Sequence, residues 1–261
     1  MSLGNRVIER IERRQRRIEE ERQERREEQY QVLEEVFDKA TLMAVYGLLN
    51  RGIIKQLLGV MKSGKESRIY RGVEPNGESL AVKIYLTVSA EFKRGMIPYL
   101  EGDPRFKGVK HDSKSLVYTW AQKEFKNLEK AQEAGVRVPK PIVVEKNVLI
   151  MEFIGENGVS APTLREERPR NPKTMYKTLL SSVKKLYGKA GLVHGDLSEY
   201  NIMNDRGQPV IFDMGQSVLV EHPLARELLL RDLKNLNIYF AKLGVAVKDV
   251  NYLFKWVTGH E

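Results

Sequence analysis

The sequence lacks cysteine, long apolar runs and an N-terminal secretory pattern. None of its 261 residues is Cys. Disulfides and Cys-ligated zinc are therefore excluded, and the composition fits a reducing compartment. A membrane-spanning helix needs about 18 consecutive apolar residues, and the sequence has no such run. We therefore expect a cytoplasmic protein with neither a membrane span nor a cleaved leader.

Histidine is also scarce, and positive charge is in excess. The four His residues stand far apart in the sequence and indicate no metal cluster. In contrast, 44 Lys and Arg outnumber 35 Asp and Glu, which gives a formal net charge of +9. A basic surface attracts anionic partners, so a nucleotide, an RNA or an acidic protein is a candidate. Basicity alone does not choose among them.

The N-terminal part is unusually rich in charge of both signs. Residues 5–30 are almost entirely Arg, Glu and Gln, with Glu and Arg recurring at helical spacing. We predict a charged helical extension over residues 1–50, and an RNA-contacting arm is the alternative interpretation of its charged face. The apolar content rises from Val32 to Leu58, which predicts helices packed on the domain that follows.

From about residue 53 the pattern changes to short β-type runs separated by turns. Asn76-Gly77 between two such runs is a strong hairpin signal. The predicted strands are 67–73, 80–85, 142–144 and 148–151.

Helical patterns surround and follow these strands. A helix is predicted from about Val117 to Ala134, where Gly135 ends it. Residues 91–118 contain many Gly and Lys and show no period, so we predict a long insertion loop. Most of the chain beyond residue 172 is predicted to be helical.

These elements predict an α+β fold of two lobes preceded by the helical extension. The small β-rich lobe would span residues 51–152, including the insertion, and a short helical lobe would span 153–261.

Three polar residues near the C-terminus carry most of the functional signal. Asp196 and Asn201 are five positions apart, and Asp213 follows a dozen positions later. This spacing is typical of a kinase catalytic loop and its magnesium-binding Asp. One carboxylate orients the attacking hydroxyl and receives its proton, while a carboxylate and an amide offer Mg²⁺ hard oxygen ligands. A capping Asp and a turn Asn would give the same spacing, so the upstream residues decide.

Two upstream residues extend this set. Lys83 lies in a β-run whose alternation turns it away from its apolar neighbours. In kinases such a lysine holds the α- and β-phosphates and pairs with a Glu on the next helix, for which Glu124 is well placed. Taken alone, Lys83 would be a surface lysine, and Glu129 and Glu133 on the same predicted helix compete with Glu124.

A possible phosphate-binding segment precedes the first predicted hairpin. Its residues are Ser63, Gly64, Lys65, Glu66 and Ser67. The two Ser hydroxyls and the backbone N–H groups are suited to cradle phosphate oxygens. The segment nearly completes a Walker A motif, but Glu66 takes the Ser/Thr position and a hairpin follows instead of a helix. We therefore reject a P-loop.

The run Met151-Glu152-Phe153-Ile154 follows an apolar strand at the predicted junction of the lobes. In the kinase interpretation, the backbone of Glu152 and Ile154 hydrogen-bonds adenine, and Met151 lines the pocket. An ordinary strand end is the alternative. His194 is interpreted as a structural member of the catalytic loop and not as a base.

Taken together and in this order, these motifs resemble the RIO kinases, atypical members of the protein-kinase superfamily. Ser-Gly-Lys-Glu at 63–66 is similar to the phosphate loop of that family, and Thr-Trp-Ala at 119–121 resembles its type 1 subfamily. The Glu/Arg-rich N-terminal segment is a poor candidate for the winged helix of type 2. The resemblance covers roughly residues 50–255, and its other motifs lie at 101–106, 122–125, 193–201, 216–218 and 222–223.

The resemblance implies an ATP- and Mg²⁺-dependent serine/threonine kinase, with Mn²⁺ as an alternative ion. Asp196, Lys83 and Asp213 would be catalytic, and Asn201 and Asp213 would bind the metal. Autophosphorylation and action on the maturing small ribosomal subunit and its RNA are also implied. The residues expected to contact the nucleotide are Ser63, Gly64, Lys65, Glu66, Ser67, Lys83, Glu124, Met151, Glu152, Ile154, Glu199 and Asn201.

The departures from ordinary protein kinases leave alternatives open. Gly195 replaces the usual catalytic-loop Arg, Asp213-Met214-Gly215 replaces D-F-G, and no A-P-E segment follows. The chain after Asp213 is too short for the usual peptide-substrate subdomains. An ATPase-driven assembly switch through a phospho-aspartate at Asp213 is therefore the second hypothesis, and a non-catalytic RNA- or ribosome-binding scaffold is the third. Ser113 and Ser115 in the predicted loop belong either to a mobile autophosphorylation segment or to a flexible solvated loop.

Overall fold

The structure is a computed structural model that describes residues 37–86, 90–108 and 112–259. The chain forms two compact units, Met1–Gly47 and Leu48–Glu261. The predicted charged helix over residues 5–30 lies outside the described residues. Helix α2 (Lys39–Asn50) begins after Asp38, whose carboxylate accepts hydrogen bonds from the backbone N–H groups of the first turn. Within the described ranges, no helix is long and apolar enough to cross a membrane.

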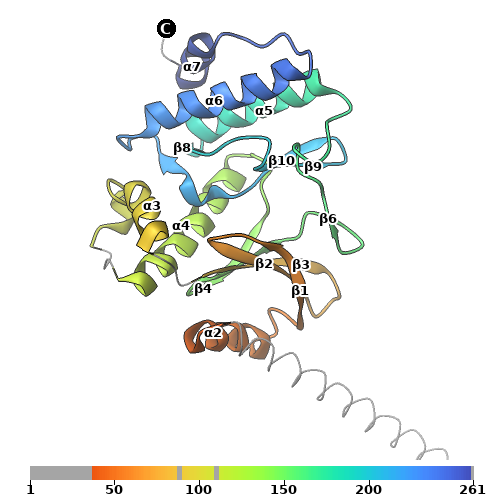
Figure 1. Ribbon diagram of the computed structural model, residues 1–261, viewed down its shortest axis with the longest axis vertical. Helices are drawn as coiled ribbons and strands as arrows, with labels where there is room; N and C mark the ends of the chain where they lie inside the picture. Colours follow the sequence, from red (N-terminus) through yellow and green to blue (C-terminus); the bar gives the residue numbers. More distant parts are fainter. Residues whose placement is uncertain (1–36, 87–89, 109–111, 260–261) are drawn as a thin grey trace, which may run out of the picture. The chain divides into compact units, whose positions relative to one another are not determined.

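A five-stranded antiparallel sheet begins the second unit (Figure 1). Its strands are β1 (Gln56–Ser63), β2 (Ser67–Val73), β3 (Ser79–Tyr85), β4 (Pro141–Glu145) and β5 (Val148–Glu152), in the order β1-β2-β3-β5-β4. The four predicted strands are confirmed, as is the turn at Asn76-Gly77, where Gly77 adopts a φ of 92°. The expected helix up to Leu58 is wrong at its end, because this residue lies in β1. Lys83 lies in the central strand, β3.

The predicted long loop at 91–118 is wrong. Helix α3 (Ala90–Leu100) and the 3-10 turn η1 (Pro104–Phe106) occupy nearly half of it, and its last six residues begin the next helix. Helix α4 (Ser113–Glu133) begins four residues before the predicted start, and Asp112 caps it by accepting two backbone hydrogen bonds. Pro98 and Gly95 hid the helical signal of α3, since both disfavour a helix interior.

Tertiary burial explains why the insertion is helical. Met96 and Leu100 of α3 pack with Leu116, Val117 and Trp120 of α4 in a small apolar core separate from the main one. Such burial stabilises a helix that propensity alone does not. Ser113 and Ser115 consequently lie in the first turn of α4 and not in a loop.

The remainder is helical, as predicted, around short ladders that carry the functional loops. Helices α5 (Pro172–Gly188), α6 (Ala225–Lys242) and α7 (Val250–Thr258) pack together (Figure 1). Leu179, Leu233 and Phe240 are among their fully buried residues. The ladders pair β6 (Gly155–Glu156) with β7 (Val159–Ser160), β8 (Leu192–Val193) with β11 (Val218–Leu219) and β9 (Ile202–Asp205) with β10 (Gln208–Ile211). The 3-10 turn η2 (Met214–Gln216) follows β10 and lies against α4. The predicted α+β class is confirmed.

Candidate active site

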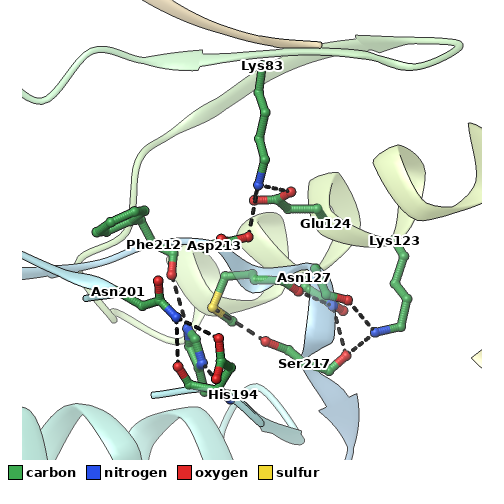
Figure 2. Close-up of polar contacts among 12 residues, drawn as sticks. Lys83, Lys123, Glu124, Asn127, His194, Asn201, Phe212, Asp213 and Ser217 are labelled. Atoms are coloured by element: carbon green, nitrogen blue, oxygen red, sulfur yellow. Dashed lines mark hydrogen bonds and ion pairs between the residues drawn. The ribbon is translucent and has the colours of Figure 1, made fainter. Parts of the chain in front are cut away.

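Lys83 joins the sheet to two carboxylates from distant parts of the chain. Its Nζ lies 2.9 and 2.8 Å from the two carboxylate oxygens of Glu124 and 2.9 Å from Oδ1 of Asp213 (Figure 2). The Lys83 side chain is 6% exposed and Glu124 is fully buried. Burial alone would lower the pKa of Lys83, but Asp213 and Glu124 outweigh it and raise the pKa above its ordinary value. Lys83 is therefore a fixed cation between a buried carboxylate and an accessible one.

Asp213 has an unusual backbone. It follows β10 with φ 64° and ψ 60°, the left-handed region that non-glycine residues seldom adopt. Its side chain is half exposed. Burial would raise the pKa of Asp213, but the Lys83 ammonium holds it below its ordinary value. Asp213 thus presents an ionised carboxylate that is partly accessible to solvent.

Asp196 lies in the loop between β8 and β9, next to Asn201. The Asn201 Nδ2 donates to the Asp196 backbone oxygen at 2.8 Å and to its carboxylate at 2.9 Å. Burial raises the pKa of Asp196, and the neighbouring Asp213 charge raises it further, against opposing effects of His194, Asn201 and Arg231. This carboxylate is a stronger proton acceptor than an ordinary surface Asp.

His194 acts as a structural member of this loop. Its Nδ1 accepts the Asp196 backbone N–H at 3.2 Å, and its Nε2 lies 3.1 Å from the Phe212 carbonyl oxygen (Figure 2). One ring nitrogen accepts and the other donates, so the ring is neutral. Burial lowers the pKa of His194, which agrees with the neutral form.

Helix α6 holds the same loop through Asp232, which is 1% exposed. Its two carboxylate oxygens accept the backbone N–H groups of Gly195 and Leu197, each at 2.8 Å. Arg231 donates to the Gly195 carbonyl. Gly195 has a φ of 82°, and a Cβ there would lie 3.0 Å from the Gln216 carbonyl oxygen, so glycine is required.

Two adjoining cavities lie at this site, and the smaller one borders Lys83, Glu124 and Asp213. The larger, about 450 Å³, has a mostly apolar wall, which includes Met61, Ile69, Ala81, Met151, Ile154 and Phe212. The smaller, about 270 Å³, is lined by polar groups, which include Gly64, Lys65, Glu66, Ser67, Lys83, Glu124 and Asp213. Lys62, Ile69, Met151 and Phe212 border both. An apolar compartment beside a polar one suits a planar base joined to a charged group.

The donor chemistry at the polar compartment fits a hard divalent cation. Partial burial raises the pKa of Glu66, and the charges of Asp213 and Asp196 contribute. A cation would relieve this excess of negative charge. No group of three or more His, Cys, Asp or Glu among the described residues could hold a metal unaided. Mg²⁺ usually takes one or two protein carboxylates and completes its shell with phosphates and water, so the half-exposed Asp213 carboxylate would suit it as a ligand.

Not every predicted site residue lies at these cavities. The predicted residues Ser63, Asp196, Glu199 and Asn201 are absent from the described residues that line either one. The Glu152 carboxylate is engaged by Arg137, at 2.7 and 2.8 Å, and by the Lys140 N–H. The Glu152 backbone N–H donates to the Lys140 carbonyl oxygen at 2.8 Å, so only the carbonyl oxygen of Glu152 is left for the predicted adenine contact.

Several residues at the site were missed by sequence reasoning. Lys123 and Asn127 of α4 and Asp232 of α6 are buried polar groups on otherwise apolar helix faces. Each of them stands at a position where the helical pattern predicts a buried apolar residue. This was the signal in the sequence that could have identified them, because buried polar groups need specific partners. Their partners come from other elements and could not be read from spacing.

Comparisons with known proteins agree with this geometry. Residues 68–253 match the sequence profile of the family described as RIO domain. The chain is 45% identical over 234 residues to the RIO-type serine/threonine-protein kinase Rio1 of Haloferax volcanii, covering 90% of this chain and 80% of that one. The Rio1 protein of Methanocaldococcus jannaschii is 39% identical, with 90% of this chain and 79% of the relative covered.

The fold has a solved counterpart. A crystal structure of the Rio2 kinase from Chaetomium thermophilum, in an ADP/Mg²⁺-phosphoaspartate complex, superposes with a TM-score of 0.66 at 21% identity. The match covers 84% of this chain and 65% of that one. The predicted two-lobed, kinase-like fold is therefore confirmed.

Proposed function

Because this chain belongs to the RIO domain family and is a serine/threonine-protein kinase, we propose that it transfers the γ-phosphoryl group of ATP to a Ser or Thr hydroxyl with Mg²⁺ as cofactor. The observation that carries this proposal is the convergence of Lys83, Glu124 and Asp213 at 2.8–2.9 Å beside the two-compartment cavity. The apolar compartment takes adenine and the polar one takes the phosphates.

The roles of the residues follow from their positions. The hydroxyl oxygen of the acceptor Ser or Thr attacks the γ-phosphorus and ADP leaves, while Asp196 accepts the proton of that hydroxyl. Lys83, oriented by Glu124, pairs with the phosphate oxygens. Asp213 and the Oδ1 of Asn201 would hold Mg²⁺, whose chemistry is to neutralise charge on the transferring phosphoryl group. Mn²⁺ would suit the same oxygen ligands.

The phosphate-binding hairpin completes the nucleotide site. Residues 64–66 form the tip between β1 and β2, and the Gly64 N–H donates to the Ser67 oxygen at 2.9 Å, which closes the turn. Gly64, Lys65 and Ser67 line the polar compartment, so we assign them to the phosphates. The domain boundaries that accompany this proposal are 51–152 for the nucleotide-binding lobe and 153–261 for the helical lobe.

The proposed macromolecular partner is the maturing small ribosomal subunit in the cytoplasm, with autophosphorylation as an associated reaction. Support comes from the net charge of +9 and from a cavity of about 670 Å³ between α5 and the α6–α7 connection. Arg170, Lys173, Lys177 and Lys248 line it, and none of its described lining residues is acidic. We call these four residues the basic groove. Such a surface suits an RNA backbone.

A second candidate function is hydrolysis of ATP through a phospho-aspartate. The half-exposed Asp213 carboxylate favours it, since its free oxygen is available to attack the γ-phosphorus. ADP would leave, and water would then release phosphate from the acyl phosphate. The Rio2 structure that resembles this chain holds a phosphoaspartate.

One experiment separates the two candidates. Wild type, Asp196→Ala and Asp213→Ala are incubated with γ-labelled ATP and Mg²⁺, and label on protein and free phosphate are followed together. Acid-stable label on Ser that is lost in both variants supports the kinase. Free phosphate in large excess over that label, with an acid-labile adduct lost in Asp213→Ala, supports the ATPase. Transfer at the wild-type rate by Asp196→Ala would refute the role of Asp196 as proton acceptor.

A further inference from the structure

The segment that follows Asp213 is held by two buried side chains of α4 that the phosphoryl-transfer chemistry does not use. Asn127 Nδ2 donates to the Met214 carbonyl oxygen at 2.9 Å and to that of Ser217 at 3.0 Å. Lys123 Nζ donates to the Gly215 carbonyl oxygen at 2.9 Å and also to that of Ser217 (Figure 2). Three carbonyl acceptors of this segment are thus satisfied from one helix.

Lys123 is an unusual residue for such a position. It is fully buried, and its hydrogen bonds go to neutral carbonyl groups instead of a carboxylate. Burial, with the nearby Arg105 charge, lowers the pKa of Lys123 to about 7. A buried amine is costly unless its donors are used, so its contacts with the segment are what keep it there.

The segment needs such support because of the backbone at Asp213. A non-glycine residue in the left-handed region persists only where its surroundings hold it there. Trp120 adds a steric restraint, since a Cβ on Gly215 would lie 2.8 Å from the indole Nε1. Hydrogen bonds from Lys123 and Asn127, the hydrogen bond from the Met214 N–H to Glu124 and the indole of Trp120 together hold the segment in place.

The insertion fixes the orientation of the Asn127 amide. Arg105 Nη1 donates to Asn127 Oδ1 at 2.9 Å, which leaves the amide nitrogen to face the carbonyls. Arg105 is itself held by Asp103 through three side-chain contacts of 2.7 to 3.2 Å. Glu101 lies in the turn between α3 and η1. Its carbonyl oxygen is 2.7 Å from His222 Nε2, and this contact links the insertion to the chain before α6.

We infer that Asn127 and Lys123 are positioning residues for the proposed metal ligand Asp213, and that the insertion controls this position through Arg105. The inference rests on the proposed function, in which Asp213 binds Mg²⁺. The conformation of the insertion and the position of the metal ligand are thereby coupled, because the Asn127 amide contacts both Arg105 of the insertion and the segment that follows Asp213. A conformational change at η1 would therefore shift Asp213 although η1 does not contact the nucleotide.

The test replaces the donating NH₂ group of Asn127 by an oxygen of the same size, which can only accept. Asn127→Asp places a carboxylate oxygen against the Met214 and Ser217 carbonyls, while the oxygen that accepts from Arg105 is kept. The matched control is Asn237→Asp. Asn237 is also buried, also donates to a backbone carbonyl (Lys248, 2.7 Å) and also accepts through its Oδ1 (from Tyr176, 2.6 Å). It lies on α6, and its hydrogen bonds among the described residues go to Lys248 and Tyr176 and not to the 214–217 segment.

The readout is ADP affinity by titration calorimetry, with and without Mg²⁺, beside the melting temperature. We expect Asn127→Asp to weaken the Mg²⁺-dependent part of binding by about 10- to 100-fold, the range for loss of groups that orient metal ligands. Its affinity for ADP without Mg²⁺ should stay at the wild-type value. Asn237→Asp should lower the melting temperature and leave the Mg²⁺ dependence unchanged.

Two further variants, Asp213→Asn and Arg105→Lys, distinguish failure of the positioning inference from failure of the proposed metal role. Asp213→Asn must abolish the Mg²⁺ dependence; if it does not, the proposed metal role itself is wrong. If Asp213→Asn behaves as expected but Asn127→Asp only matches Asn237→Asp, the positioning inference is overturned. Should Asn127→Asp not fold, Arg105→Lys keeps a cation beside Asp103 but loses the guanidinium fork. It should show a smaller loss in the same direction, and wild-type Mg²⁺ dependence in that variant would overturn the inference.

Discussion

At the scale of single residues, one buried ion pair links stability to activity. The Lys83 and Glu124 side chains are 6% and 0% exposed, so neither charge has water as an alternative partner. Pairs of this kind add little net stability, yet breaking one leaves an uncompensated buried charge. The same ammonium also restrains Asp213. Stability and activity should therefore respond differently to single and double substitutions.

Substitution at Lys83 should separate these two effects. Lys83→Met leaves Glu124 buried without a cation, so we expect unfolding to become easier by about 3–5 kcal/mol. Phosphoryl transfer should fall by at least about 100-fold, as for the loss of a transition-state donor. The double variant Lys83→Met/Glu124→Gln should recover much of the stability and none of the activity. Denaturant unfolding and labelled-phosphate transfer measure the two, and recovery of both would contradict the role of Lys83.

The pKa of Asp196 predicts a pH dependence. In the role proposed for Asp196 its carboxylate acts when ionised, so activity should be retained above the pKa of Asp196 and lost as the pH falls through it. Because burial raises this pKa, the acid limb should lie above the ordinary Asp value of 3.8. The charge of Arg231 lowers it, so Arg231→Gln should move the limb to higher pH. A pH profile of kcat/KM checks this, and a limb displaced to lower pH would contradict it.

At the scale of elements, α6 supports the loop that carries Asp196. Asp232 lies among apolar residues of this helix, and its two oxygens accept one loop N–H each. Burial raises the pKa of Asp232 to about 7 even though both hydrogen bonds oppose the shift. The helix thus fixes the backbone at Gly195 and Leu197, on either side of Asp196, through these two hydrogen bonds.

Asp232→Asn should loosen this support. One oxygen becomes an NH₂ group that faces a backbone N–H, so a buried donor loses its acceptor. We expect a loss of about 1–3 kcal/mol in unfolding free energy. The value of kcat should fall while the KM for ATP changes little, because the cavity walls are untouched. Glu227→Gln, on the exposed face of the same helix, is the control; equal effects from both variants would show that α6 does not act through Asp232.

At the scale of the whole molecule, the helical lobe carries a basic surface apart from the nucleotide cavities. The basic groove adjoins the exposed Tyr252 of α7, whose ring centroid lies 6.0 Å from Lys248 Nζ. On the same helix, the partly exposed Trp256 ring has Lys184 Nζ 4.3 Å from its centroid. Cations next to exposed rings suit single-stranded nucleic acid, whose phosphates and bases both find partners. Among the described residues, the groove shares no lining residue with the two cavities proposed for ATP, so both can be occupied together.

Neutralising the groove should therefore weaken RNA binding selectively. For Lys173→Gln/Lys177→Gln we expect lower affinity for ribosomal RNA and a salt slope reduced by about 1–2, since each phosphate contact contributes nearly one. The ADP affinity should not change. Lys55→Gln/Lys114→Gln removes the same charge elsewhere on the surface. Fluorescence anisotropy across a salt series measures the slopes, and equal reductions in both double variants would assign the effect to net charge alone.

The sequence by itself determined the elements and chemistry that depend on local order. The alternating runs and Asn76-Gly77 define the central hairpin, because side-chain period and turn geometry are local properties. The spacing of Asp196, Asn201 and Asp213 identified a kinase-type loop, since that chemistry requires those groups in a short stretch.

Only the tertiary structure decided how distant groups meet. The insertion became helical through burial against α4, which local propensity around Pro98 did not indicate. Asp232 and Asn127 gained their partners from segments tens of residues away, and a buried polar group is defined by such partners. Contacts of this kind depend on packing in three dimensions, and the order of residues along the chain does not contain them.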